Sequence, residues 1–309
     1  MSVPTGQSKG YLDPETLQKL ENLELVARDV VEGMRAGMHR SPLRGFSTDF
    51  AQHRQYVPGD DIKHIDWRVY GRTSRYYVKL YEAETNLKAY MLLDASSSMH
   101  YGSGAVDKLE YAKYMAAALS YIIVQQHDSA GLGVFDSELR SHIEPQGTKS
   151  IIHTIDRELR QVEGEPRTDV GAILHEFARR ISRRAVVVLF SDLFDETDAF
   201  LAGLDHLRFQ GHNVMVLHTM DPDELTFPFS GTCRFEGLEG ESPIITQPQR
   251  IREDYVEEVR KFVRAIRDAC RRSQVDYMLV DTSQPVDMTL NQFLRGQAET
   301  NLPAERSLL

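Results

Sequence analysis

The sequence predicts an α/β fold: a doubly wound, mostly parallel six-stranded sheet of Rossmann-like type, preceded by an N-terminal helix and a small β-rich lobe. Three observations predict it. From residue 87 onward, short apolar runs alternate with amphipathic stretches of helical length, which is typical of buried parallel strands joined by helices. Two of these runs are separated by only three residues, which predicts one antiparallel edge. Residues 39–84 lack the alternation and are rich in Arg, His, Tyr and Asp.

The N-terminal helix is expected to begin at an Asp-Pro pair, residues 13–14, because Asp caps helices and Pro is accepted at the first helical position. Apolar residues then recur at three- and four-residue spacing as far as Met34, which gives the helix one apolar face. Residues 39–84 contain a Pro-Gly-Asp-Asp turn signal and short alternating segments, which indicate the β-rich lobe. We assign residues 1–86 to the helix and the lobe.

The order of the apolar runs gives the elements of the sheet domain. The predicted strands are 89–93, 131–135, 139–143, 185–190, 214–218 and 277–280. The predicted helices are 107–126, 149–162, 170–182, 195–209 and 252–273. Residues 221–249 carry several Pro and Gly residues, interrupt the alternation and are expected to form an insertion with a small β-hairpin. The sheet domain so defined covers residues 87–296, and a polar tail, 297–309, follows it.

Candidate metal ligands follow the first strand of the sheet. Asp94 lies at the carboxyl end of this strand, and Ser96 and Ser98 lie on the loop after it. Open α/β sheets bind ligands beyond the carboxyl ends of their strands, where the topology switches. Alternate residues of an extended loop point the same way, and oxygen ligands suit a hard divalent cation. The Asp-x-Ser-x-Ser pattern alone is weak evidence, since composition produces it on the order of once per ten chains of this length.

Two distant segments supply the missing context. Thr168 lies at the entrance of a predicted helix, and Asp192 follows the fourth apolar run. If that strand neighbours the first, Asp94 and Asp192 face each other, and five residues form one cluster of oxygen ligands: Asp94, Ser96, Ser98, Thr168 and Asp192. A plainer interpretation makes the hydroxyls helix caps and Asp192 a solvated helix start. The combination of all five favours the metal site.

The five residues resemble the metal-ion-dependent adhesion site of the von Willebrand factor A fold, and the resemblance covers about residues 87–281. It implies a bound Mg²⁺ or Mn²⁺ whose coordination shell is completed by a carboxylate of a partner protein. The direct ligands implied are Ser96, Ser98 and Thr168. The residues implied to act mainly through ordered waters are Asp94 and Asp192. The family's Thr-x-x-Gly-x-x-Leu arrangement is present as Thr168, Gly171 and Leu174.

Other segments resemble the bacterial domain-of-unknown-function family 58. They are residues 40–42, 45–47, 54–61 and 65–67, which lead into the first strand, and 221–224 in the insertion. This resemblance covers nearly the whole chain. It implies partnership with a MoxR-type AAA+ ATPase and a chaperone-like role in assembling or remodelling a client protein. Many members carry membrane-spanning helices before this segment, whereas this sequence shows none, so we expect a cytoplasmic protein.

The leading hypothesis is therefore a non-enzymatic, divalent-metal-dependent protein-binding module. The alternative is a metal-dependent phosphatase or hydrolase that uses Asp94 or Asp192. Sites of the haloacid-dehalogenase type usually have a second Asp two residues after the nucleophile, where this chain has Ser96. Another set of candidate acid–base residues matches no ligand motif and is interpreted as part of an ion-paired collar: His39, His53, His64 and Asp66.

Composition excludes several other classes of protein. The 36 basic and 46 acidic side chains give a net charge of −10, which disfavours a nucleic-acid partner. The two cysteines, Cys233 and Cys270, lie far apart and outside any Cys/His cluster, so neither a disulfide scaffold nor a zinc finger is expected. No apolar stretch approaches the ~20 residues that a membrane-spanning helix needs.

Overall fold

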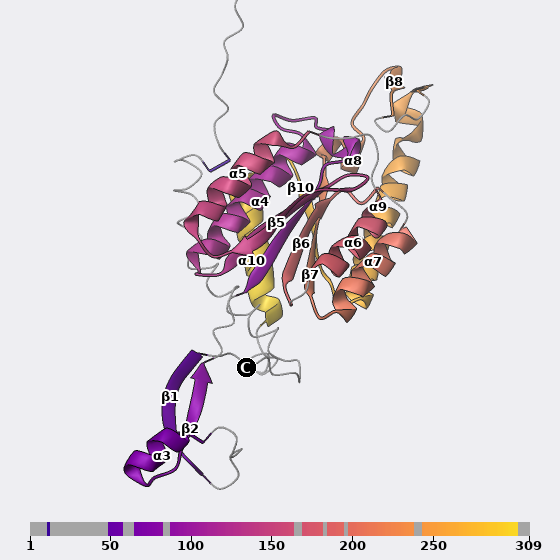
Figure 1. Cartoon of the computed structure of the whole chain (residues 1–309). Helices are drawn as coiled ribbons and strands as arrows, with labels where there is room; N and C mark the ends of the chain where they lie inside the picture. Colours follow the sequence, from indigo (N-terminus) through magenta and orange to yellow (C-terminus); the bar gives the residue numbers. More distant parts are fainter. Residues whose placement is uncertain are drawn as a thin grey trace, which may run out of the picture. The chain divides into compact units, whose positions relative to one another are not determined.

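The computed structural model describes residues 11–12, 49–57, 65–82, 87–163, 169–181, 184–194, 197–237 and 243–301. The chain divides into two compact units, the smaller formed by Gly37–Asn86 and the larger by Met1–Ala36 with Leu87–Leu309. The candidate site belongs to the larger unit, a sheet between two layers of helices (Figure 1). The N-terminal helix predicted between residues 13 and 34 lies outside the described residues.

A six-stranded sheet with the strand order β10-β7-β6-β3-β4-β5 forms the centre of the larger unit. The bounds are β3 Lys88–Asp94, β4 Ser129–Phe135, β5 Leu139–Gln146, β6 Val186–Ser191, β7 Asn213–Met220 and β10 Asp276–Asp281. All neighbours pair in parallel except β5, which runs antiparallel to β4 at one edge. Every residue of β6 is buried, as expected for a central strand with both faces covered. The predicted α/β fold and its antiparallel edge are confirmed.

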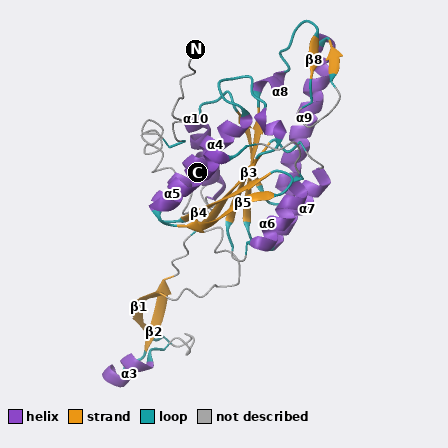
Figure 2. Cartoon of the chain, turned by 45° about the horizontal axis from the view of Figure 1, so that its top comes forward, coloured by secondary structure: helices purple, strands orange, loops and turns teal. Residues whose placement is uncertain are grey.

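Helices cover both faces of the sheet, with α4, α5 and α10 on one face and α6, α7 and α9 on the other (Figures 1 and 2). The bounds are α4 Lys108–Gln125, α5 Lys149–Gln161, α6 Val170–Arg180, α7 Thr197–Phe209, α9 Pro248–Arg272 and α10 Val286–Asn301. Only α10 among these was not predicted, and it runs into the segment expected to be a polar tail. Its buried Leu290, Phe293 and Leu294 have helical spacing and face the core.

The two helices α6 and α7 approach each other closely because glycines lie between them. A Cβ atom on Gly171 of α6 would lie only 2.6 Å from the carbonyl carbon of Ala199. A Cβ atom on Gly203 of α7 would lie 2.7 Å from the Cβ of Leu174. The absence of side chains at these two positions therefore sets the distance between the helices.

The insertion contains a short helix, α8 (Pro222–Thr226), and a two-stranded hairpin of β8 (Cys233–Phe235) and β9 (Ile244–Thr246). The predicted hairpin is confirmed, and α8 is an addition to it. Asp221 caps α8, and the side chain of Glu224 reaches back to the Asp221 backbone N–H in a capping box. Phe227 stacks on Tyr255 of α9, with 4.2 Å between the ring centroids. The insertion is thus attached both to the end of β7 and to α9.

The smaller unit holds an antiparallel pair, β1 (Asp49–Gln55) and β2 (Tyr77–Glu82), with the short helix α3 (Trp67–Thr73) between them. This is the predicted β-rich lobe. Asp66 caps α3 by accepting hydrogen bonds from the N–H groups of Arg68 and Val69. His39 and His64 lie outside the described residues.

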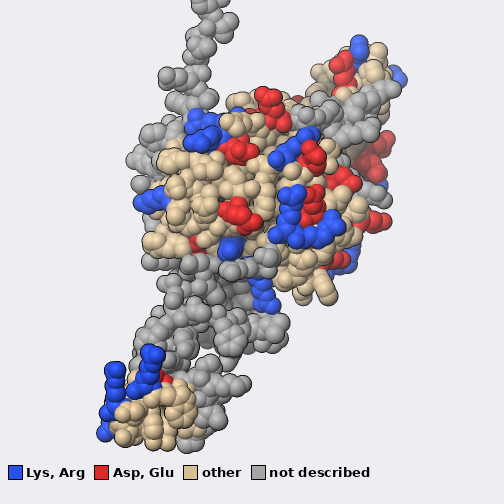
Figure 3. Space-filling view, viewed as in Figure 1, with Lys and Arg blue, Asp and Glu red and all other residues tan. Residues whose placement is uncertain are grey.

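Two surface properties bear on function. Among the helices that are described, none is long and apolar enough to cross a bilayer. On the face of the larger unit drawn in Figure 3, acidic and basic side chains are interspersed. The described residues of that face form no continuous basic stripe, the feature that is typical of proteins that bind nucleic acid.

Candidate functional site

The candidate site lies at the carboxyl end of β3, between β4 on one side and β6 on the other. This is the point where the chain order reverses, and it is where sheets of this class bind ligands. Asp94 ends β3, and a single turn of 3₁₀ helix, Ser97–His100, follows it. The Oγ atoms of Ser96 and Ser98 lie 3.0 Å apart. The two hydroxyls converge, as their alternate spacing predicted.

Asp94 is completely buried, and both of its carboxylate oxygens accept hydrogen bonds. The backbone N–H of Ser96 donates to Oδ1 at 2.9 Å, and Ser191 Oγ donates to Oδ2 at 2.6 Å. Burial and the nearby charge of Asp192 raise the pKa of Asp94 above its ordinary value, and the hydrogen bonds from Ser191 and Ser96 oppose this rise. Asp94 therefore fixes the serine loop to the end of β6.

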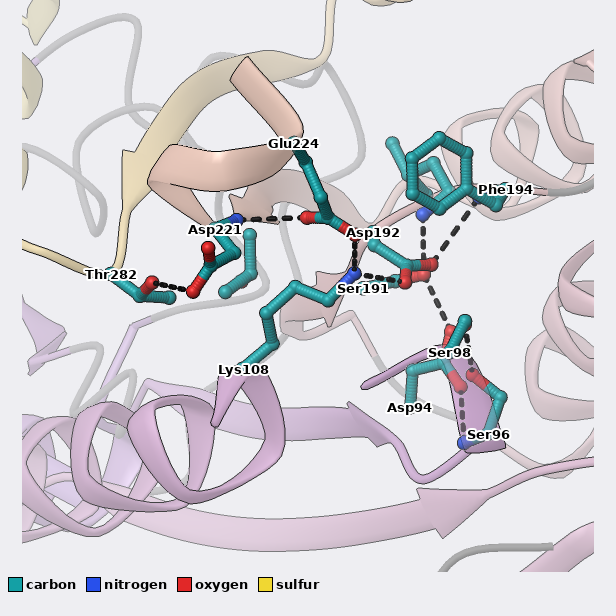
Figure 4. A network of polar contacts seen from close by, with 12 residues as sticks. Asp94, Ser96, Ser98, Lys108, Ser191, Asp192, Phe194, Asp221, Glu224 and Thr282 are labelled. Atoms are coloured by element: carbon teal, nitrogen blue, oxygen red, sulfur yellow. Dashed lines mark hydrogen bonds and ion pairs between the residues drawn. The ribbon is translucent and has the colours of Figure 1, made fainter. Parts of the chain in front are cut away.

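Asp192 follows β6 directly and is buried. Beside it lies the ammonium group of Lys108, a residue that no sequence motif marks. Lys108 Nζ donates to Asp192 Oδ2 at 2.8 Å and to Glu224 Oε1 at 2.6 Å (Figure 4). The other oxygen of Asp192 accepts only a long bond, 3.3 Å, from the N–H of Phe194. The sequence gives one indication of a partner for Lys108. A lysine in the first turn of a helix lies at the positive end of the helix dipole, which is unfavourable unless an anion lies nearby.

The structure bears on the plainer interpretation, in which the hydroxyls only cap helices and Asp192 is a solvated helix start. Ser96 occupies an N-cap position, but its side chain makes no capping hydrogen bond and faces Ser98 instead. Asp192 is 1% exposed, so it is not a solvated helix start. The cap of α6 is Asp169, whose side chain accepts from the N–H of Ala172. Thr168 lies outside the described residues, so the structure brings together four of the five predicted residues: Asp94, Ser96, Ser98 and Asp192.

The donor set fits a small, hard cation better than a transition metal. Within the part of the chain that is described, no group of three or more His, Cys, Asp or Glu side chains could hold a metal ion. The candidate ligands here are instead the hydroxyl oxygens of Ser96 and Ser98. Octahedral Mg²⁺ with bonds of about 2.1 Å holds neighbouring ligand oxygens about 3.0 Å apart. The two hydroxyls are hydrogen-bonded to each other, and the 3.0 Å between Ser96 Oγ and Ser98 Oγ equals that spacing.

A buried histidine lies next to the site. His218 of β7 is paired with Ser191 across the sheet, and its Nδ1 lies 2.8 Å from the hydroxyl of Tyr277. Its Nε2 has no hydrogen-bond partner among the described residues. Burial lowers the pKa of His218 to about 4, although Asp192 works in the opposite direction. His218 is therefore a neutral member of the core.

The fold and the arrangement at the end of β3 define the class of protein. A mostly parallel sheet with one antiparallel edge, flanked by helices and carrying an Asp-x-Ser-x-Ser loop at its switch point, is a von Willebrand factor A-like domain. The chain belongs to the DUF58 family, a family of proteins of unknown function, whose model matches residues 52–264.

The chain is similar in sequence to mycobacterial proteins and in fold to several solved structures. The uncharacterized protein Rv1480 of Mycobacterium tuberculosis is 24% identical over 245 residues, which cover 76% of this chain and 75% of that protein. BatB from Bacteroides thetaiotaomicron, described as a conserved hypothetical protein, is 18% identical, with a TM-score of 0.47, over 69% of this chain and 99% of that chain. The von Willebrand A domain of SpRpn10 is 13% identical, with a TM-score of 0.39, over 67% of this chain and 95% of that one.

Proposed function

We propose that this protein is a non-enzymatic, divalent-metal-dependent protein-binding module. The observation that carries the proposal is the convergence of Ser96 and Ser98, with 3.0 Å between their hydroxyl oxygens, beside the buried carboxylates of Asp94 and Asp192. Hydroxyl ligands bring no charge into direct contact with the cation, so a bound Mg²⁺ or Mn²⁺ can still accept an anionic oxygen as a further ligand.

Each residue has a separate task in this proposal. Ser96 and Ser98, together with Thr168, are the direct ligands. Asp94 holds the serine loop through the Ser96 N–H, and both Asp94 and Asp192 act mainly through ordered waters, since their oxygens already accept bonds from the protein. When bound, the cation supplies an open coordination position for a carboxylate of the partner protein.

The partner proposed is a MoxR-type AAA+ ATPase, which acts with this protein in the chaperone-like assembly or remodelling of a client protein. What supports this part of the proposal is the resemblance to the domain-of-unknown-function family 58, to which the chain belongs. We place the protein in the cytoplasm, where such an ATPase and its nucleotide are found.

A phosphatase or hydrolase using Asp94 or Asp192 is the less favoured alternative. A nucleophile needs an oxygen that the substrate can reach, whereas Asp94 is fully buried and both of its oxygens accept hydrogen bonds. Asp192 is buried as well and bonded to Lys108. Turnover of p-nitrophenyl phosphate that is lost in an Asp94→Asn variant would support the enzyme instead.

Capture of the MoxR-type ATPase from the same organism tests the binding function. We expect the immobilised protein to retain the ATPase in the presence of Mg²⁺, and to lose it on addition of EDTA or in the Ser96→Ala/Ser98→Ala variant. Ser120→Ala is the matched control, because this buried hydroxyl bonds only within its own helix. Retention that is indifferent to both EDTA and the double substitution contradicts metal-dependent adhesion.

A further inference from the structure

The side chain of Lys108, the first residue of α4, places a positive charge at the candidate metal site. It is fully buried, and its ammonium lies 2.8 Å from Asp192 Oδ2 and 2.6 Å from Glu224 Oε1. The ring of Phe194 covers it, with 5.2 Å between Nζ and the ring centroid. The two carboxylates within hydrogen-bond distance compensate for the removal of the ammonium from water. The ammonium is therefore charged in the folded protein.

Lys108 and the serine loop lie on two sides of the same carboxylate. One carboxylate oxygen of Asp192 accepts a hydrogen bond from Lys108 Nζ, and the other accepts only a long bond from the Phe194 N–H (Figure 4). A divalent cation at Ser96 and Ser98 would be attracted by Asp192 and repelled by the ammonium behind it. Part of the charge that would stabilise such a cation is thus already neutralised by Lys108.

Lys108 also joins the site to the insertion through Glu224. The second oxygen of Glu224 accepts from the backbone N–H of Asp221 at 2.8 Å, which closes the capping box of α8. Asp221 in turn accepts from the N–H and the hydroxyl of Ser103, in the loop that leads from the serines to α4. A chain of short contacts therefore runs from Asp192 through Lys108 to α8.

We propose that Lys108 is a positioning residue that weakens the affinity of the site for divalent cations and couples its occupancy to α8 at the start of the insertion. The inference rests on the proposed function, because it concerns the same metal site. As Asp192 turns toward an occupied site, its contact with Lys108 loosens, and the contact that ties α8 to the end of β6 loosens with it. The insertion, whose hairpin exposes Ile244 and Ile245, then responds to the state of the site.

Calorimetric titration with Mn²⁺ tests the first half of the proposal. We expect the Lys108→Met/Glu224→Gln variant, which removes one charge of each sign, to bind Mn²⁺ about tenfold more tightly than the unaltered protein. The milder Glu224→Gln variant leaves Lys108 with Asp192 alone, and we expect it to bind about threefold more weakly. The control Lys113→Met/Glu110→Gln removes the ion pair between another buried lysine of α4 and a partly exposed glutamate, and it should change the Kd by less than about twofold.

Hydrogen exchange followed by mass spectrometry tests the coupling. Saturating Mn²⁺ should speed amide exchange in residues 221–229 of the unaltered protein and of the Lys113 control, and leave it unchanged in Lys108→Met/Glu224→Gln. Equal Mn²⁺ affinities in all variants, or exchange in α8 that ignores Mn²⁺ in the unaltered protein, overturn the inference and leave the proposed function standing. Absence of Mn²⁺ binding in the unaltered protein and every variant overturns the proposed function, and this inference with it. Binding that appears only after Lys108 is replaced supports the inference.

Discussion

Ser191 donates a hydrogen bond from its Oγ to Oδ2 of Asp94 across 2.6 Å and thereby joins the carboxyl ends of β6 and β3. Both side chains are completely buried, so this bond compensates for the removal of the carboxylate from water. The same hydroxyl accepts from the backbone N–H of Leu193 at 3.0 Å. One side chain therefore holds the Asp94 loop and the segment after β6 in a fixed relation.

We predict that Ser191→Ala destabilises the protein by about 2 kcal/mol, because a buried carboxylate oxygen loses its donor and the N–H of Leu193 loses its acceptor. Urea denaturation at neutral pH measures the loss. Ser120→Ala is the matched control: its buried hydroxyl donates to the Ala116 carbonyl in the same helix, and its removal should cost less than about 1 kcal/mol. Equal losses in the two variants would contradict the role assigned to Ser191.

We predict that Gly171→Ala destabilises the protein by about 3 kcal/mol, since the new methyl group would lie 2.6 Å from the backbone of Ala199 and force α6 away from α7. Gly104→Ala serves as the comparison, because no atom lies within 4 Å of the position its Cβ would take. Its free energy of unfolding should stay within about 0.5 kcal/mol of the unaltered value. A stable Gly171→Ala protein would show that α6 and α7 can separate without loss.

The buried, neutral His218 predicts loss of stability in acid. Its pKa is about 4 in the folded protein, below the ordinary value of 6.5, so between these values the unfolded chain binds a proton that the folded protein does not. Stability attributable to His218 is therefore constant above about pH 6.5 and falls as the pH drops toward 4. We expect unfolding free energies measured at about pH 7.5 and pH 5 to fall by about 2 kcal/mol more in the unaltered protein than in His218→Gln. The same fall in both proteins would contradict a neutral His218.

The sheet could be predicted from sequence because its signals are local. Buried strands and amphipathic helices each mark themselves within a few residues, and the short link before residues 139–143 identified the antiparallel edge. The placement of Asp94 near Asp192 followed from one further assumption, that their strands are neighbours, and β3 does pair with β6. Helix α10 was missed although Leu290, Phe293 and Leu294 carry helical spacing.

The buried part of the site could not be predicted, because it depends on contacts between distant segments. Lys108, Asp192 and Glu224 come from three separate segments of the chain, and nothing in the sequence distinguishes Lys108 from an exposed lysine except its place in the first turn of α4. The Thr-x-x-Gly-x-x-Leu pattern contains both a residue that serves helix packing and a residue proposed to bind the metal. Gly171 serves the packing of α6 on α7, and Thr168 is the position proposed as a ligand.

Binding of Mg²⁺ or Mn²⁺, measured by calorimetry on the unaltered protein beside Ser96→Ala/Ser98→Ala, tests the central claim most directly. The account predicts saturable binding of one cation per chain in the unaltered protein, a loss of affinity of about tenfold or more in the double variant, and unchanged binding in Ser120→Ala. If neither the unaltered protein nor Lys108→Met/Glu224→Gln takes up a cation at millimolar concentration, or if the double serine variant binds as tightly as the unaltered protein, the claim that these serines form a metal site is wrong.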